Sequence, residues 1–437
     1  MTKIPLLFGF SIIFLIANAC SKNSGTSQTT PPPASDTLLT NHQHLDQLYV
    51  PVVFSDGTHA AGIFIYSQYP DYHPVEASGE GYTCVDDVSR AALFYLRSPA
   101  LKSDTAIQSK LYNLIQFMLE MQAPSGYFYN FLQQGSSINM FGPTSAATPN
   151  WWSWRALQSL TEAYPVVKGM NADLAVKMNT AIQKLISVIK SDMIPLPKTT
   201  EVVNGVTIPQ WLPAGSGTDQ ASPIILGLIN YSSQNPDSVL NSYIRKLADG
   251  LVLMQLGDSI SYPYDMIMSW QNTWHAYGND QALALLQAGV FLNDGLYINA
   301  GIQEVNNLFP WILKNNFKSS VTVNEVSGVI SQVGGSNYDQ IAYGFRPLIS
   351  AAAKAFQLTG DAKYADLAGQ LAAWFLGAND ASAQMYNPAT GVCFDGISAG
   401  NSVNKNSGAE STIEALLSFQ IVEANPEIKT ALNKYKK

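Results

Sequence analysis

From residue 84 to the C-terminus, apolar residues recur about every three to four positions, in segments of helical length. Short polar runs separate these segments, so successive helices are expected to pack as antiparallel neighbours. Residues 46–80 lack this periodicity, and Asp56-Gly57 between two apolar runs predicts a β-hairpin there. We predict twelve helices, near residues 84–97, 104–122, 152–164, 172–191, 218–233, 238–256, 270–292, 299–315, 338–358, 362–377, 409–423 and 426–435.

Twelve helices in six successive pairs favour an all-α (α/α)6 toroid with a short N-terminal β segment. Odd-numbered helices would form an inner ring and even-numbered helices an outer ring. Inner helices are covered on both sides, so apolar residues should occupy more of their circumference. Residues 341–356 and 413–422 fit this expectation, whereas Arg245, Lys246 and Asp249 indicate an outer helix. The alternative is an open helical solenoid, although the sequence has no strict repeat.

The N-terminus has the pattern of an export signal. Lys3 precedes an apolar stretch, and the small residues Ala-Asn-Ala at 17–19 precede Cys20. The stretch is too short to span a membrane and predicts a signal peptide over residues 1–20. The cysteine at the cleavage point resembles that of a bacterial lipobox, which implies that Cys20 carries a lipid. The alternative is an ordinary cleavage site with an incidental cysteine.

Residues 21–44 consist mostly of Ser, Thr, Asn, Gln, Gly and Pro. A segment with so few large apolar side chains cannot bury enough surface to offset its ordering entropy, so we predict a flexible tether. One toroid domain is then expected over residues 45–437, lipid-anchored at the bacterial cell envelope on its periplasmic or cell-surface face. The net charge of −8 and the lack of a basic run argue against nucleic acid as a partner.

Aromatic and polar side chains gather at the predicted starts of the inner helices. In a toroid these N-termini meet at one mouth, where free N–H groups and helix dipoles favour polar ligands. Aromatic faces stack on sugar rings while polar groups bind hydroxyls, so we predict a carbohydrate site there. N-caps and buried core residues are the alternative interpretation of each position. The candidate binding residues are Arg90, Trp151, Trp152, Trp154, Trp211, Asp219, Gln220, Trp270, Asn272, His275, Tyr338, Tyr343, Arg346, Asp395 and Asn406.

Carboxylates at these helix starts are the candidate catalytic groups. Asp86 and Asp87 are adjacent and Arg90 follows within one turn, so one acid can face the mouth while Arg90 holds the other. Ring closure would bring Glu410 beside them. Two carboxylates in different environments are what glycoside hydrolysis requires, one as acid and one as base or nucleophile. We predict Asp86 or Asp87 paired with Glu410, with Asp339 as a further candidate.

The sequence also allows expectations about a disulfide, about cofactors and about partners. Ring closure can bring Cys84 next to Cys393, so a disulfide is one expectation and two buried thiols are the other. The sequence holds no metal-ligand or nucleotide-binding motif, and we expect neither a metal nor another cofactor. We expect a monomer whose partner is a carbohydrate.

Two stretches resemble bacterial (α/α)6-toroid carbohydrate-active domains of the six-hairpin glycosidase-like type. Residues 86–91 (Asp-Asp-Val-Ser-Arg-Ala) are similar to the DDxxRA helix of that group. Residues 406–412 (Asn-Ser-Gly-Ala-Glu-Ser-Thr), with 374–380, 386–391 and 395–397 before them, are similar to its GAEST run. The resemblance implies the toroid fold and a carbohydrate-active protein. The adjacent aspartates also resemble those of endo-α-mannosidases of this fold, although the flanking residues differ.

Three functions remain open, because the same fold supports several chemistries. The first is an exported glycoside hydrolase that uses the carboxylate pair. The second is a polysaccharide lyase or sugar epimerase, with His275 as base and Tyr338, Tyr343 and Arg346 around it. The third is non-catalytic glycan capture, which would depend more on the tryptophans than on the acids.

Overall fold

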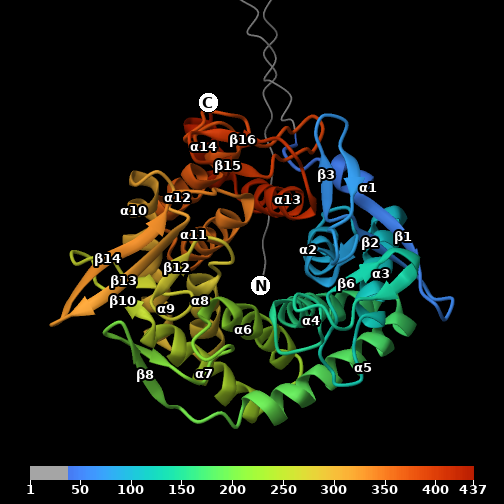
Figure 1. The fold of residues 1–437 in the computed structure, drawn as a ribbon, viewed down its shortest axis with the longest axis horizontal. Coiled ribbons are helices and arrows are strands. Elements are labelled where there is room, and N and C mark those ends of the chain that lie inside the picture. The colour runs from blue at the N-terminus through green and yellow to red at the C-terminus, as the bar shows by residue number, and fades with distance from the viewer. Residues whose placement is uncertain (1–37) are drawn as a thin grey trace, which may run out of the picture. The chain divides into compact units, whose positions relative to one another are not determined.

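A computed structural model describes residues 38–437, which form a closed double ring of helices (Figure 1). Each inner helix packs against the next, and the last packs back onto the first. This closure confirms the predicted toroid and excludes an open solenoid. The predicted signal peptide, Cys20 and most of the predicted tether lie outside the described residues. The inner helices are α2 (Val85–Leu96), α4 (Trp151–Met170), α6 (Thr218–Ser232), α8 (Gln281–Leu292), α11 (Arg346–Thr359) and α13 (Ala409–Ala424).

The outer ring supplies an antiparallel partner for each inner helix. Four of its helices begin after an aspartate whose carboxylate accepts backbone N–H bonds: Asp104, Asp237, Asp294 and Asp361. The inner helices α6, α8, α11 and α13 begin without a side-chain cap, so acids near their starts are available for other contacts. The outer elements are α3 (Thr105–Glu120), α5 (Ala172–Val188) with η2 (Ile189–Met193), α7 (Ser238–Leu253), α9 (Gly295–Gln303) with the π-helical turn η3 (Glu304–Leu308) and α10 (Phe309–Lys314), α12 (Ala362–Ala372) with η5 (Ala373–Phe375), and α14 (Pro426–Tyr435).

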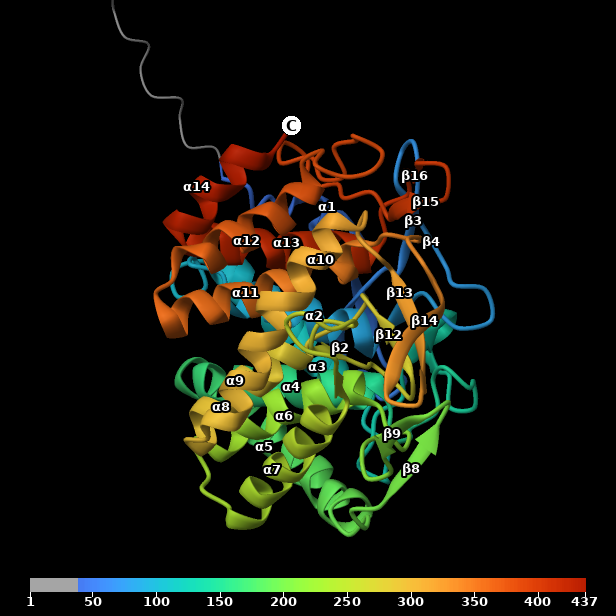
Figure 2. The ribbon, with the colours of Figure 1, turned by 90° about the vertical axis from the view of Figure 1, so that its left-hand side faces the viewer.

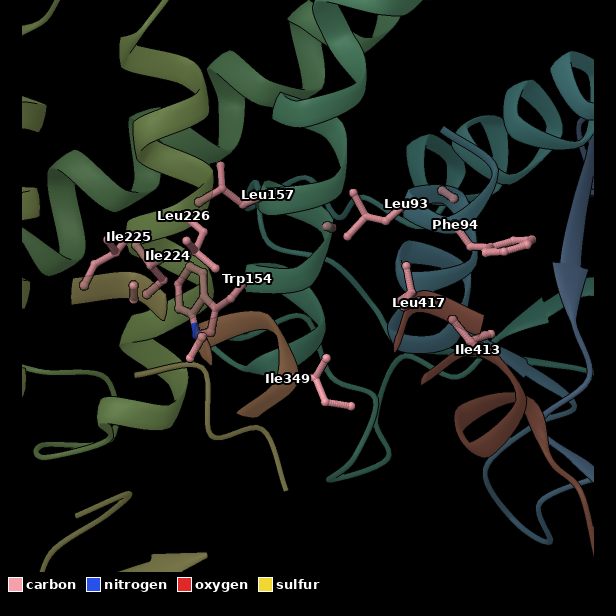
Figure 3. Close-up of a cluster of buried hydrophobic side chains, with 14 of the residues drawn as sticks. Leu93, Phe94, Trp154, Leu157, Ile224, Ile225, Leu226, Ile349, Ile413 and Leu417 are labelled. Atoms are coloured by element: carbon pink, nitrogen blue, oxygen red, sulfur yellow. The ribbon is translucent and has the colours of Figure 1, made fainter. Parts of the chain in front are cut away.

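Apolar side chains fill the space between neighbouring helices. Trp154 and Leu157 of α4 lie beside Ile224 and Ile225 of α6, and all four are buried (Figure 3). Burial of this kind is the main favourable contribution to folding, at about 25 cal/mol for each Å² of apolar surface removed from water. None of the described helices is long and apolar enough to cross a membrane.

The two ends of the toroid differ in the length of their connections. At one end Asn171 alone links α4 to α5, and Asn425 alone links α13 to α14. At the other end, where the inner helices begin, long segments such as 121–150, 254–280 and 376–408 carry most of the small sheets (Figure 2). We call the first the short-loop end and the second the mouth.

The sheets are antiparallel and have two or three strands each. The predicted hairpin is present, with β1 (Tyr49–Val53) paired to β2 (His59–Ile63) around Gly57, whose φ of 86° favours glycine. The remaining sheets are β3 (Tyr66–Gln68) with β4 (His73–Val75); β5 (Thr83–Cys84), β6 (Phe131–Gln133) and β7 (Ser137–Ile138), with η1 (Gln134–Ser136) between the last two; β8 (Thr200–Val203) with β9 (Val206–Pro209); β10 (Gln255–Leu256) with β11 (Met266–Ile267); β12 (Thr273–His275), β13 (Ser320–Val326) and β14 (Val329–Ser336); and β15 (Gly396–Ser398) with β16 (Ser402–Asn404).

Two of the predicted inner helices begin later than expected. Residues 273–275 form β12 rather than the start of a helix, and α8 begins at Gln281, after Gly278 with its φ of 65°. Residues 338–345 form a loop with a short 3-10 turn, η4 (Ala342–Gly344), and α11 begins at Arg346. Pro347 explains this start, because proline fits the first turn of a helix, where its missing N–H costs nothing.

The N-terminal segment closes the seam between the first and last inner helices. The Leu39 N–H and the Thr40 hydroxyl each donate to one carboxylate oxygen of Glu423, both at 2.5 Å. The segment continues into α1 (Gln43–Leu48), where the ring of the fully buried His44 lies 2.9 Å from the Ser407 carbonyl. Residues 38–44, which composition assigned to the tether, therefore pack as part of the toroid.

Candidate functional site

A cavity of about 370 Å³ lies at the mouth, and its wall spans the α2–α13 seam. Asp86, Asp87 and Arg90 reach it from α2, Glu410 from α13 and Asp339 from the loop before α11. Ring closure thus brings together all four residues that the sequence indicated as catalytic candidates. Among the described lining residues the acids are Glu80, Asp86, Asp87, Asp339, Asp395 and Glu410, and the one cation is Arg90.

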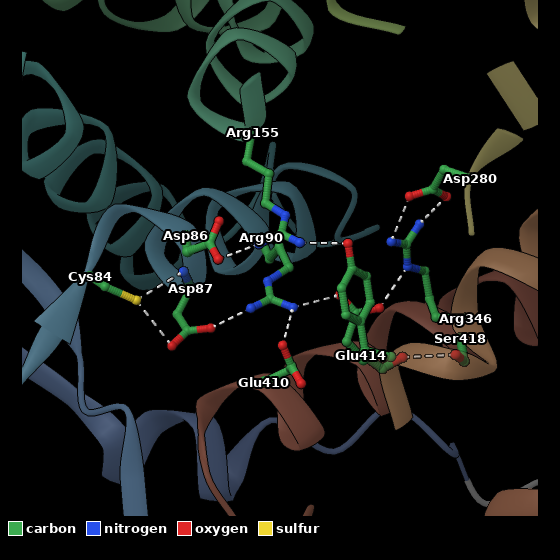
Figure 4. A network of polar contacts seen from close by, with 11 residues as sticks. Cys84, Asp86, Asp87, Arg90, Arg155, Asp280, Arg346, Glu410, Glu414 and Ser418 are labelled. Atoms are coloured by element: carbon green, nitrogen blue, oxygen red, sulfur yellow. Dashed lines mark hydrogen bonds and ion pairs between the residues drawn. The ribbon is translucent and has the colours of Figure 1, made fainter. Parts of the chain in front are cut away.

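Arg90 connects the two sides of the seam (Figure 4). Its guanidinium donates to Asp87 at 2.6 Å, to Glu410 at 3.1 Å and to Glu414 at 3.2 Å. Arg90, Asp87 and Glu414 are buried, so this shared cation offsets the desolvation of the carboxylates. The predicted arrangement, with Arg90 holding one acid of the adjacent pair, is present, and the acid held is Asp87.

Two further arginines complete a charged layer below the cavity. Arg155 pairs with Asp86 and donates to the Tyr343 hydroxyl at 2.5 Å. Arg346 binds the two carboxylate oxygens of Asp280, at 2.9 and 3.1 Å, and one oxygen of Glu414 at 2.6 Å. The guanidinium carbons of Arg90 and Arg155 each lie 5.0 Å from the ring centre of Tyr343. We call these residues (Asp86, Asp87, Arg90, Arg155, Asp280, Tyr343, Arg346, Glu410 and Glu414) the arginine layer.

Burial changes the acidity of several groups in this layer. Desolvation raises the pKa of Glu410, and the charge of Arg90 partly opposes that rise. The carboxylate of Glu410 nevertheless faces the cavity, since 42% of its side chain is exposed. Burial likewise raises the pKa of Asp87, and it raises the pKa of Tyr343 to about 12, so that this phenol stays neutral. Glu410 is therefore an accessible carboxyl group with an increased tendency to hold a proton.

The other cavity carboxylates differ in how far their oxygens are occupied. Asp87 is bound by Arg90 and by the thiol of Cys84, which lies 3.3 Å from its second oxygen. Asp86 is bound by Arg155 through one oxygen, and its other oxygen is buried. Asp339 is exposed at the cavity wall, and no side chain of residues 38–437 binds its carboxylate. Of the three aspartates, Asp339 has the most freely accessible oxygens.

Cys84 and Cys393 are buried free thiols, so the expectation of a disulfide between them was wrong. Cys84 accepts the Asp87 N–H as a weak N-cap of α2, and its thiol donates to the Asp87 carboxylate. Cys393 donates to the Phe394 carbonyl at 3.6 Å. Each thiol has a polar partner on its own side of the seam, and desolvation raises the pKa of both.

None of the five predicted tryptophans lines the mouth cavity. Trp152, Trp154 and Trp211 are buried, and their indole N–H groups donate to Phe128, Gln220 and Lys246. The alternative interpretation, core packing, describes these three, because their rings are buried and none of them lines the cavity. Trp151 is half-buried under the guanidinium of Arg155, and Trp270 is exposed beside the Ala214 carbonyl; neither lines the cavity.

His275 also lies outside the cavity. It is buried in β12, stacked on Tyr277 with ring centres 3.7 Å apart. One ring nitrogen is 2.8 Å from the Tyr277 carbonyl and the other is 3.1 Å from the Asp219 carboxylate. Both nitrogens face acceptors and neither is free, which makes His275 a poor candidate for a base. Gln220 is likewise engaged, as the acceptor for Trp154.

The other predicted binding residues have structural partners. The Asn272 amide donates to the Val323 carbonyl at 2.6 Å, and the Tyr338 hydroxyl lies 3.1 Å from an Asp380 carboxylate oxygen and 2.9 Å from the Asn401 side-chain oxygen, either of which can accept its proton. Asn406 accepts the Tyr69 N–H at 3.1 Å. Asp395 lines the cavity, but one of its oxygens accepts the Gly408 N–H and the Ser411 hydroxyl, which fixes the start of α13.

Sequence reasoning missed several residues of the site. Glu414 and Arg155 could have been found, because a charged side chain on an otherwise apolar helix indicates a polar interior. Tyr66, Glu80 and Asn130 line the cavity from connecting segments, and no local pattern marked them. The Asn130 side-chain oxygen accepts the Asp86 N–H at 3.1 Å, so this residue fixes the first turn of α2.

No family of protein sequences and no curated protein sequence matches the chain. Three solved structures show how widely the fold is shared. Cellobiose 2-epimerase from Bacillus thermoamylovorans B4167 superposes with a TM-score of 0.58 at 10% identity, over 87% of this chain and 95% of that one. GH family 9 endoglucanase J30 gives 0.52 at 11% identity (88% and 83%). A family 76 glycoside hydrolase from a bovine Bacteroides thetaiotaomicron strain gives 0.55 at 10% identity (87% and 76%). At these identities the likeness shows the fold alone, and the chain has the (α/α)6-toroid fold.

Proposed function

We propose that the chain is a glycoside hydrolase whose catalytic groups are Glu410 and Asp339 at the mouth cavity. The observation that carries the proposal is the contrast between these two carboxyl groups in one cavity. Burial raises the pKa of Glu410, while Asp339 is exposed and unpaired among the described side chains. Hydrolysis of a glycosidic bond requires this combination, one carboxyl group to protonate the leaving oxygen and another to act as base or nucleophile.

In this mechanism Glu410 is the general acid. Arg90 holds one of its carboxylate oxygens, which leaves the other to face the glycosidic oxygen. Asp339 then activates water or attacks the anomeric carbon directly. The paired carboxylates Asp86 and Asp87 would orient Arg155 and Arg90 rather than react, because their oxygens are occupied or buried.

The charge of the cavity favours a neutral or cationic glycan. Six acids and one arginine line it among the described residues, so a uronic acid would meet like charges at close range. A lyase acting on uronates needs a group that neutralises the substrate carboxylate, and Arg90 is already bound to three acids. Tyr66 at the cavity wall, 49% exposed, offers an aromatic face for a sugar ring.

Sugar epimerisation is the second candidate, because the toroid neighbours include cellobiose 2-epimerase. The described lining of the mouth cavity contains no histidine, and His275 is engaged at both nitrogens. An epimerase would therefore need a carboxylate as its base.

We propose in addition that the protein works at the bacterial cell envelope, as the N-terminal sequence indicates.

Incubation with neutral oligosaccharides and chitosan oligosaccharides in ¹⁸O-enriched water tests the reaction type. Hydrolysis places one ¹⁸O atom in a product, epimerisation leaves the mass unchanged, and a lyase yields unsaturated fragments. We expect Glu410→Gln and Asp339→Asn each to lower kcat by at least about a hundredfold, the lower end of a general acid–base contribution. Glu76→Gln, a change on an exposed loop residue, is the matched control. Binding without product across the panel would indicate glycan capture and would refute the catalytic roles.

A further inference from the structure

A second cavity, of about 390 Å³, lies on the other side of the arginine layer. Arg90, Arg155, Tyr343 and Arg346 form its inner end, and Arg90 also lines the mouth cavity. Its walls follow the axis-facing stripes of all six inner helices toward their C-termini, where Arg97 and Gln357 are exposed. This rear cavity therefore opens at the short-loop end of the toroid, away from the proposed catalytic groups.

Three consecutive inner helices each present one carboxamide to the rear cavity. Gln158 comes from α4, Asn230 from α6 and Gln287 from α8, and all three side chains line the space. None of the three amide groups binds another side chain or backbone group of residues 38–437, and each is partly exposed. Free amides offer both donors and acceptors, which is the combination that a hydroxyl group requires.

Apolar side chains line the rear cavity about one helical turn beyond the arginine layer, at the level of Gln158 and one turn before Asn230 and Gln287. Leu93, Leu226 and Leu417, labelled in Figure 3, line the cavity from α2, α6 and α13. Leu283 completes this girdle from α8. A wall with an apolar band and a few convergent polar groups is the usual composition of a small-ligand site, and the volume lies within the usual range.

The charges around the rear cavity are largely compensated. Each arginine of its inner end is bound to a carboxylate, and Arg97 forms two bonds to Glu162, at 2.7 and 2.9 Å. The Lys354 amine donates to Gln357, and burial lowers its pKa. No described cluster of unpaired cations or anions remains to bind a charged ligand. The lining therefore favours a neutral, hydroxyl-rich ligand.

We propose that the rear cavity is a second carbohydrate site, which binds a neutral monosaccharide through the amides of Gln158, Asn230 and Gln287. The leucine girdle would cover the C–H face of the sugar while the amides bind its hydroxyls. The site is separate from the mouth, so it does not depend on the reaction proposed there. A sugar bound at this position would contact the arginine layer from the side opposite the substrate.

Titration calorimetry of the full chain with D-glucose and with D-mannose tests the proposal. We expect saturable binding of at least one sugar, weakened about tenfold or more by Gln158→Leu combined with Gln287→Leu, since the double variant loses the hydrogen bonds of two amides to the sugar. Asn230→Leu, on a different helix, gives an independent test if the double variant misfolds. Glu410→Gln at the mouth should leave this binding unchanged even if it abolishes hydrolysis. Failure of both sugars to bind the wild-type chain, or equal binding by the rear-cavity variants, would overturn the proposal.

Discussion

Glu304 provides a quantitative test of the packing described above. It lies in the π-helical turn η3 with its side chain fully buried. One carboxyl oxygen accepts the Ile267 N–H at 3.0 Å, and the other has no partner. Burial raises the pKa of Glu304 to about 8, with a further contribution from the nearby charge of Asp265. The folded chain therefore holds a proton on Glu304 at pH 7, whereas the unfolded chain releases it.

The sign and size of the effect follow from this difference. The ordinary pKa of a glutamate is 4.5, so below that pH both states are protonated and the fold has its full stability. Between pH 4.5 and about 8 the folded state holds the additional proton, and stability falls by about 1.4 kcal/mol for each pH unit. The loss is about 5 kcal/mol in total and is complete above pH 8. Glu304→Gln keeps the acceptor for Ile267 and removes the ionisation.

Denaturant unfolding at pH 5, 7 and 9, followed by tryptophan fluorescence, measures the prediction. At pH 5 the free energy of unfolding of Glu304→Gln should lie within about 1–2 kcal/mol of the wild-type value, the difference being the cost of an unpaired amide N–H. At pH 9 the free energy of unfolding of the variant should exceed that of the wild type by about 3–5 kcal/mol. Glu76→Gln, which changes an exposed glutamate, should leave the pH dependence unchanged. If the wild type and Glu304→Gln curves run parallel from pH 5 to 9, the reasoning about this buried carboxyl group is wrong.

Three further outcomes are expected. Trp154→Ala should destabilise the fold by about 3–5 kcal/mol in thermal or denaturant unfolding, because the ring is fully buried. An unchanged unfolding midpoint together with weaker glycan binding would instead indicate that Trp154 contacts the ligand. Arg90→Met should move the alkaline limb of the rate profile to higher pH, because Arg90 lowers the pKa of the proposed acid Glu410; a shift to lower pH would argue against that role. Cys84 and Cys393 should resist a thiol reagent until the chain unfolds, with or without reductant, and rapid labelling of either residue in the native protein would contradict its burial.

The helical part of the fold was predictable because apolar periodicity is a local property of each segment. The starts of α8 and α11 were not, since Gly278 and Pro347 act through backbone conformation that the apolar pattern around them conceals. That Arg90 holds one of the two adjacent acids followed from helical spacing, whereas the structure identifies that acid as Asp87. Glu410 could be placed beside them only through ring closure, which is a property of the whole chain.

The tryptophans show why the site was harder to predict than the fold. On α4, Arg155 and Gln158 face the axis, being about one helical turn apart. Trp154 precedes Arg155 by one position, which turns its side chain by about 100° and directs it into the wall between helices. Trp151, one turn before Arg155, lies under that guanidinium instead. Without one reference residue known to face the axis, the sequence leaves this rotation undetermined.

The seam between α2 and α13 has a consequence for synthesis of the chain. Asp86 and Arg90 belong to the first inner helix, while Glu410 and Glu414 belong to the last. A nascent chain that has not yet reached α13 lacks one side of the mouth cavity and leaves Arg90 without two of its carboxylate partners. Leu39 and Thr40 find their partner, Glu423, only when that helix is complete. Chains truncated before α13 should therefore be inactive, and the proposed activity would emerge only after α13 has been synthesised.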